Sequence, residues 1–109
     1  MVSGIYLTNV EKIARGRVTE EGAKRVLIQV LIDRHRAATF IMRRFLVKPG
    51  GETPLHSHRW EHEVFVLKGR GIVTDGKVKL GLKPGIAVYV PRNKRHQFKN
   101  VANSRWEFL

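Results

Sequence analysis

Glycine, proline, asparagine and aspartate interrupt this chain at short intervals, and these interruptions limit what it can fold into. The runs between them are short and rich in valine, isoleucine and phenylalanine, which is typical of strands rather than helices. We expect strands at residues 24–32, 39–47, 63–67, 72–74, 77–80, 86–90, 96–101 and 105–109, and at most a helical turn at 10–14. Many short strands separated by turn residues predict an all-β sandwich or barrel.

The length of 109 residues fits a single domain, residues 1–109. We expect its core at about 24–109 and an N-terminal arm or edge strand at 1–23. No apolar run approaches the roughly 20 residues that span a bilayer, and the first residues do not resemble a secretory leader. We therefore expect no membrane partner and a cytoplasmic location. The absence of cysteine excludes disulfides, thiolate ligands and a cysteine nucleophile.

The chain is strongly basic, with 21 Lys and Arg against 9 Asp and Glu. Such a charge can mark a solvated surface, a positive field for anionic substrates, or a nucleic-acid partner. The basic residues are spread along the chain, with short clusters only at 34–36, 43–44 and 92–95. Because there is no basic tail and no helix-turn-helix pattern, we favour a solvated surface first and attraction of anionic substrates second. A nucleic-acid partner is not expected.

Four of the five histidines form one pattern: His56, His58 and His62 lie close together, and His96 follows far downstream. Imidazole is the commonest protein ligand for divalent transition metals. A short cluster and one distant histidine suit a barrel, in which one strand region supplies several ligands and a facing strand completes the set. The sequence therefore predicts a metal site. The fifth histidine, His35, lies between two arginines and is expected at the surface.

Side chains on a strand point alternately to its two faces, so alternation sorts inward from outward residues. If His62 opens its strand pointing inward, Val64 and Val66 line the interior, and Glu63 faces outward together with Phe65 and Leu67. The same rule predicts a pocket whose walls are Phe45, Phe98, Trp106 and Phe108. Arg43 would be a lone inward cation that holds an anionic substrate, and Arg44 would be solvated.

The spacing of these residues resembles the two motifs of the cupin superfamily. The first motif is a glycine, five residues, His-x-His, three or four residues, usually a glutamate, six residues and a glycine. Its counterparts here are Gly50, His56, His58, His62 and Gly69. The second motif is a glycine, five residues, Pro-x-Gly, two residues, a histidine, three residues and an asparagine. Its counterparts are Gly85, Pro91, Asn93, His96 and Asn100.

The sequence departs from the motifs at two positions. Asn93 stands where the family often has glycine, and asparagine tolerates the left-handed conformation of such a turn. His62 stands where the usual glutamate ligand would be, and Glu63 is the alternative if four residues follow His58. The spacing to Gly69 and the strand alternation both favour His62.

The segment from 56 to 70 looks especially like small single-domain cupins of thermophiles that bind manganese or another divalent metal through four histidines. The resemblance implies a jelly-roll barrel (a double-stranded β-helix), a homodimer and one divalent metal per chain. The metal would be Mn foremost, with Fe, Cu, Ni and Zn open, and the ligands would be His56, His58, His62 and His96. Four neutral imidazoles leave the charge of the ion uncompensated, which favours binding of anions.

Three functions fit these residues, because the fold alone does not decide among them. The first is a metal-dependent oxidoreductase of dioxygenase type that acts on a small, anionic organic substrate, with Arg43 as its anchor. The second is a metal-dependent isomerase or hydrolase on the same ligands. The third is a non-enzymatic metal- or ligand-binding protein. Glu61 and Glu63 are either hydrogen-bond partners of the ligand histidines or simple surface charges.

Overall fold

A computed structural model describes residues 4–109. The elements in chain order are a 3-10 helix η1 (Val10–Lys12) and nine strands: β1 (Gly16–Arg17), β2 (Lys24–Ile32), β3 (Met42–Glu52), β4 (His62–Lys68), β5 (Gly71–Thr74), β6 (Lys79–Leu82), β7 (Ala87–Val90), β8 (Gln97–Lys99) and β9 (Trp106–Phe108). The prediction of an all-β fold is thus confirmed. Residues 1–3 of the expected N-terminal arm lie outside the described residues.

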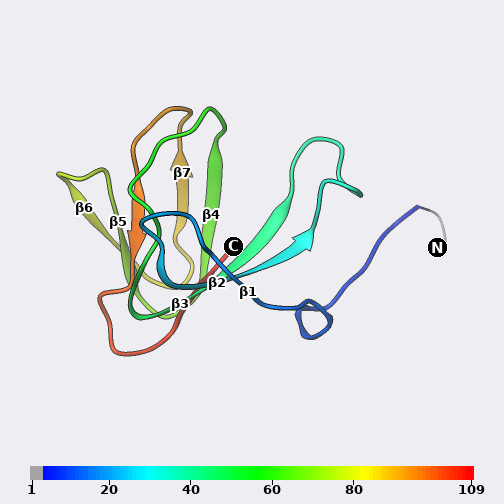
Figure 1. The fold of residues 1–109 in the computed structure, drawn as a ribbon, viewed down its shortest axis with the longest axis horizontal. Helices are drawn as coiled ribbons and strands as arrows, with labels where there is room; N and C mark the ends of the chain where they lie inside the picture. Colours follow the sequence, from blue (N-terminus) through cyan, green and yellow to red (C-terminus); the bar gives the residue numbers. More distant parts are fainter. Residues whose placement is uncertain (1–3) are drawn as a thin grey trace.

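All strand pairings are antiparallel, in the order β6-β5-β8-β3-β9-β4-β7, with β2 paired to β3 and β1 paired to β2. Strand β3 lies between β8 and β9, so that strands distant in sequence meet on it. The sheet curls into a partly open barrel, and the far end of the β2–β3 hairpin projects away from it together with the N-terminal segment (Figure 1). Within residues 4–109, no helix has the length and apolar character needed to cross a bilayer.

The barrel interior is filled by side chains that point inward from the strands. In β4, Val64 and Val66 are buried, whereas Phe65 and Leu67 are exposed, as alternation predicts. The buried cluster consists of Val26, Val47, Val64, Val66, Val73, Leu82, Val90, Phe98, Trp106 and Phe108. The core requires a glycine at one close contact: a Cβ on Gly71 would lie 2.5 Å from ring atoms of Trp106.

A second buried layer lies on the outer face of β3, and it corrects one prediction. Arg44 was expected to be solvated, but its side chain is only 15% exposed and forms an ion pair with Glu107 of β9. Its guanidinium also donates to Gln29 Oε1 of β2 at 2.8 Å. The N-terminal segment covers this face, because Gln29 Nε2 donates to the carbonyls of Val10 and Ile13. A polar network therefore ties β2, β3 and β9 together beneath that segment.

Candidate metal centre

Two of the predicted ligands face each other across a single β-bridge. His56 N donates to the His96 carbonyl at 3.1 Å, and His96 N donates to the His56 carbonyl at 2.9 Å. Their imidazole centroids are therefore only 4.9 Å apart, although the residues are 40 positions apart in the chain (96 − 56). The bridge explains how the distant histidine joins the cluster.

The other two histidines come from the segment that leads into β4: His58 lies in the loop before it, and His62 is its first residue. The loop is held by a 2.7 Å hydrogen bond from Asn93 N to the His58 carbonyl, and Asn93 has the left-handed φ of 63° that the second motif predicts. His62 is the first residue of β4 and pairs with Val90 of β7. His58 Nε2 and His62 Nε2 are 2.8 Å apart, so the fourth ring also reaches the cluster.

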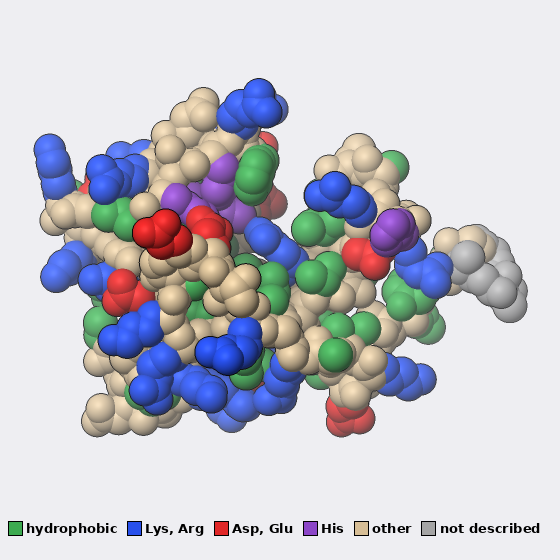
Figure 2. Space-filling view, viewed as in Figure 1, with side chains coloured by type: hydrophobic (Ala, Val, Ile, Leu, Met, Phe, Trp, Pro, Cys, Tyr) green, Lys and Arg blue, Asp and Glu red, His purple; other side chains and the backbone are tan. Residues whose placement is uncertain are grey.

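The four rings lie close to one another, and the space-filling view shows a group of histidine side chains beside acidic and hydrophobic ones on this face of the barrel (Figure 2). His56, His58 and His96 each offer one ring nitrogen, and these three atoms lie within 4.8 Å of one another. His62 lies beside them, with its ring centroid 5.2 Å from that of His96. Three histidines thus form a group that could hold a metal ion, and the fourth stands next to it.

The hydrogen bonds of the three-histidine group fix which ring nitrogen is free. Each Nδ1 has an acceptor: Glu20 Oε2 at 2.7 Å for His56, the Trp60 carbonyl at 2.9 Å for His58, and the Lys94 carbonyl at 2.8 Å for His96. In a neutral imidazole the nitrogen that donates carries the proton, so Nε2 keeps its lone pair. This is the arrangement of a metal-ligating histidine whose second nitrogen is held by an outer partner.

The surroundings also keep two of the rings uncharged. Burial lowers the pKa of His62 to about 3, and the positive charge of Arg43 adds to this effect, followed by the other three histidines. Burial likewise lowers the pKa of His96, against the opposing effect of its hydrogen bond to the Lys94 carbonyl. A metal binds the neutral form of imidazole, so the lowered pKa of both rings favours metal binding over protonation.

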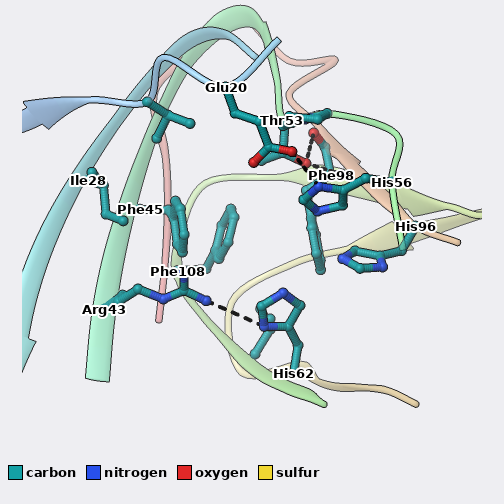
Figure 3. Close-up of a pocket in the computed structure, with 13 residues that line it drawn as sticks. Glu20, Ile28, Arg43, Phe45, Thr53, His56, His62, His96, Phe98 and Phe108 are labelled. Atoms are coloured by element: carbon teal, nitrogen blue, oxygen red, sulfur yellow. Dashed lines mark hydrogen bonds and ion pairs between the residues drawn. The ribbon is translucent and has the colours of Figure 1, made fainter. Parts of the chain in front are cut away.

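A pocket adjoins the histidines, and Figure 3 shows its residues. Arg43 reaches into it from β3, with its guanidinium 5.3 Å from the centroid of the Phe45 ring. The lining residues are Val18, Glu20, Ile28, Arg43, Phe45, Thr53, Pro54, His56, His62, Val64, His96, Phe98 and Phe108. The pocket is therefore mostly apolar, with one guanidinium on one side and one carboxylate on the other.

The structure corrects one of the predicted wall residues. Phe45, Phe98 and Phe108 line the pocket, but Trp106 does not. Trp106 is fully buried and packs against Phe98 and Phe108 from within the core. Alternation correctly predicted that it points inward, yet the ring belongs to the layer behind the pocket wall. Trp60, in contrast, is exposed and stacks on His58 with centroids 4.2 Å apart.

Sequence reasoning missed the carboxylate that contacts a histidine. Glu61 accepts a hydrogen bond from the Tyr89 hydroxyl, and Glu63 faces outward, so neither touches the cluster. Glu20 takes this role from the turn between β1 and β2, 36 residues before His56. No local pattern announces such a contact, since it depends on how the N-terminal segment folds back over the barrel.

The sequence model of the cupin domain family matches residues 43–109. The chain belongs to the cupin family. This cupin is 36% identical over 93 residues to the 1-methylthio-D-xylulose 5-phosphate methylsulfurylase of Rhodospirillum rubrum, which covers 83% of the chain and 59% of that protein. An uncharacterized protein of Methanocaldococcus jannaschii is 34% identical over 59 residues, 53% of this chain and 47% of that one. The chain thus spans about half the length of the curated relatives it matches.

Solved structures show the same fold. The polyketide cyclase RemF from Streptomyces resistomycificus superposes with a TM-score of 0.88 at 32% identity, over 95% of this chain and 75% of that one. A predicted oxalate decarboxylase from Thermotoga maritima superposes with a TM-score of 0.85 at 23% identity, over 94% of both chains. The expected jelly-roll cupin architecture is therefore confirmed.

Proposed function

We propose that this cupin is a metal-dependent oxidoreductase of dioxygenase type that acts on a small, anionic organic molecule. The observation that carries the proposal is the three-histidine group, in which every Nδ1 has an oxygen acceptor and one ring nitrogen of each residue lies within 4.8 Å of the others. Three convergent imidazole nitrogens are a donor set that suits divalent transition metals.

The proposed ligand set includes His62 as the fourth member, and Mn as the preferred metal with Fe next. The short distance of 2.8 Å between the Nε2 atoms of His62 and His58 supports the inclusion of His62 as the fourth ligand. A divalent ion held here supplies Lewis acidity, and Mn or Fe also supplies electron transfer. No carboxylate is among these ligands, so the ion keeps its positive charge and attracts anionic molecules.

The residues of the chain itself bind and orient the substrate in this proposal. Arg43 binds the anionic end, because it is a half-buried guanidinium that has no carboxylate within ion-pair distance among residues 4–109. Phe45, Phe98 and Phe108 enclose the apolar body and exclude water. The phosphate in the name of the Rhodospirillum rubrum relative's substrate supports a preference for anions in this pocket.

An isomerase or hydrolase is the second candidate, and Glu20 is the observation that favours it. Its carboxylate lines the pocket and is 54% exposed, so it can carry a proton between solvent and a bound molecule. Acid–base chemistry requires such a group within hydrogen-bond reach of the substrate. Oxidation by dioxygen does not depend on it.

The test combines metal analysis with two kinetic readouts. The protein is stripped, reloaded with Mn²⁺ or Fe²⁺ and assayed with a panel of carboxylates and phosphate esters for dioxygen uptake and for exchange of substrate hydrogen with ²H₂O. One metal per chain that is lost in His58→Ala, together with metal-dependent dioxygen uptake, supports the proposal. Hydrogen exchange without dioxygen uptake supports the isomerase. Failure to bind metal after reloading refutes the metal centre.

We further propose that the chain forms a homodimer through the projecting end of the β2–β3 hairpin. Phe40 is 77% exposed there, and Ile41, Met42 and Val30 are about 40% exposed. Several exposed apolar side chains on one projecting element are typical of an association site. Light scattering coupled to gel filtration should give twice the chain mass for the parent and the single-chain mass for Phe40→Glu. Monomeric parent protein at micromolar concentration would refute the dimer.

A further inference from the structure

One histidine of the cluster differs from the other three in the partner of its Nδ1. His62 Nδ1 lies 3.5 Å from Arg43 Nη2, whereas the other three Nδ1 atoms face oxygen acceptors. A guanidinium only donates hydrogen bonds and stays protonated in proteins. The Nδ1 of His62 must therefore accept, which leaves the proton of the neutral ring on Nε2.

The rest of the network agrees with this placement of the proton. His62 Nε2 is 2.8 Å from His58 Nε2, so one of the two atoms donates. His58 already donates from Nδ1 to the Trp60 carbonyl, and its Nε2 is an acceptor when the ring is neutral. The chain of donors thus runs from Arg43 through His62 to His58. In this arrangement the atom of His62 nearest the cluster carries a proton and cannot bind a metal.

Binding of a metal through His62 Nε2 reverses the two positions. The proton then lies on Nδ1, so that the N–H of His62 and the N–H of Arg43 point at each other and no hydrogen bond can form between them. The exchange uses water, with one proton lost from Nε2 and one gained at Nδ1, so the charge of the ring does not change. Arg43 has to leave His62, and the nearest alternative for its guanidinium is the pocket that it already lines, next to Phe45.

We propose that Arg43 couples metal binding to anion binding: it contacts His62 in the metal-free chain and is released into the pocket when His62 becomes the fourth metal ligand. The inference rests on the proposed metal centre and deepens it. Arg43 is a positioning residue for His62 in one state and an anion-binding residue in the other. Because coupling between two binding sites is reciprocal, an anion that holds Arg43 should also tighten the binding of metal.

The test measures Mn²⁺ affinity by calorimetry in Arg43→Gln and Arg43→Met, each alone and combined with His62→Ala. Glutamine offers an amide oxygen that accepts from His62 Nδ1–H, whereas methionine removes the guanidinium without replacing it. We expect both variants to bind Mn²⁺ more tightly than the parent, with glutamine ahead of methionine by about tenfold, the size of one outer hydrogen-bond partner of a ligand. The gain should vanish in the His62→Ala background.

Arg92→Gln is the matched control, because it removes an exposed positive charge elsewhere in the chain. A gain that persists without His62, or that Arg92→Gln reproduces, would reduce the effect to simple charge and overturn the inference. Equal affinities in the parent and both Arg43 variants would overturn it as well. If the parent itself binds no Mn²⁺, the proposed metal centre fails together with the inference.

Two further readouts test the two states directly. In the metal-free protein, ¹⁵N NMR should show the proton of His62 on Nε2 in the parent and a shift toward Nδ1 in Arg43→Gln. With benzoate as the anionic probe, Mn²⁺ should tighten benzoate binding in the parent by more than in Arg43→Gln, in which only direct ligation remains. A parent whose metal-free His62 carries its proton on Nδ1, or equal benzoate coupling in both proteins, would contradict the proposal.

Discussion

Replacing Arg44 by methionine should destabilise the barrel far more than its place on the outer face of β3 suggests. The substitution removes hydrogen bonds to Gln29 and Glu107 and leaves a carboxylate that is only 7% exposed. Breaking one half of a buried ion pair costs about 3–5 kcal/mol. We expect the lower end, about 3 kcal/mol, because Arg105 Nη2 remains 3.6 Å from the same carboxylate and screens it. That corresponds to a fall in Tm of roughly 12–24 °C.

The assay is urea unfolding of the metal-free protein, followed by circular dichroism, with the double variant Arg44→Met/Glu107→Leu as the decisive comparison. Without either charge, the remaining loss is the unpaired Gln29 Oε1, worth about 1–3 kcal/mol. The double variant should therefore be no less stable than Arg44→Met alone. A single variant within about 0.5 kcal/mol of the parent, the range of ordinary surface substitutions, would refute the reasoning. A double variant whose loss of unfolding free energy equals the sum of the losses of Arg44→Met and Glu107→Leu, each measured alone, would refute it as well.

Three other variants test separate parts of the structure. Glu20→Ala should weaken Mn²⁺ binding by about tenfold, and Glu20→Gln by less, because the amide oxygen still accepts a hydrogen bond from His56 Nδ1. Calorimetry measures the affinity, and the control Glu61→Gln should leave it unchanged. The unfolding free energy of the metal-free protein should fall as the pH falls from about 6.5 toward 3. The reason is that His62 takes up a proton in the unfolded chain, whereas in the folded chain its pKa is lowered to about 3. Urea titrations over this pH range should show a weaker dependence of the unfolding free energy on pH for His62→Asn. Gly71→Ala should lower the unfolding free energy by about 1–3 kcal/mol in the same titration, because its methyl group would overlap the Trp106 ring, and unchanged stability would disprove that contact.

The parts of the fold that depend on local pattern could be predicted from the sequence. Alternation has a period of two residues, so one correct inward residue assigns a whole strand, as with Val64 and Val66 in β4. The turn at Asn93 is also a local feature: asparagine tolerates a left-handed conformation, and Asn93 adopts a φ of 63°. The motif spacing also grouped the four histidines that the structure brings together.

The failures share a different cause, since each depends on what covers a face of the sheet. Alternation separates the two faces of β3 but cannot say that the N-terminal segment buries the outer one, so Arg44 was wrongly expected in solvent. Glu20 escaped notice because its partner His56 is 36 residues away. Trp106 faces inward as alternation predicts, but it lies in the core behind the pocket wall. Alternation gives the side of the strand to which a residue points and does not tell whether that residue reaches the pocket.

The polar network beneath the N-terminal segment has a practical consequence for protein engineering. The family match begins at residue 43, whereas Gln29 and Glu20 precede it. A designer who transplants only the matched region into another scaffold would discard β2. The graft would carry an unpaired strand edge along β3, an Arg44 without its partner Gln29, and a His56 without the carboxylate of Glu20. A transferable unit of this cupin therefore has to begin before Val10, so that it keeps β2 and the two carbonyls to which Gln29 donates. A library built around the pocket should hold Glu20, Gln29, Arg44 and Glu107 constant.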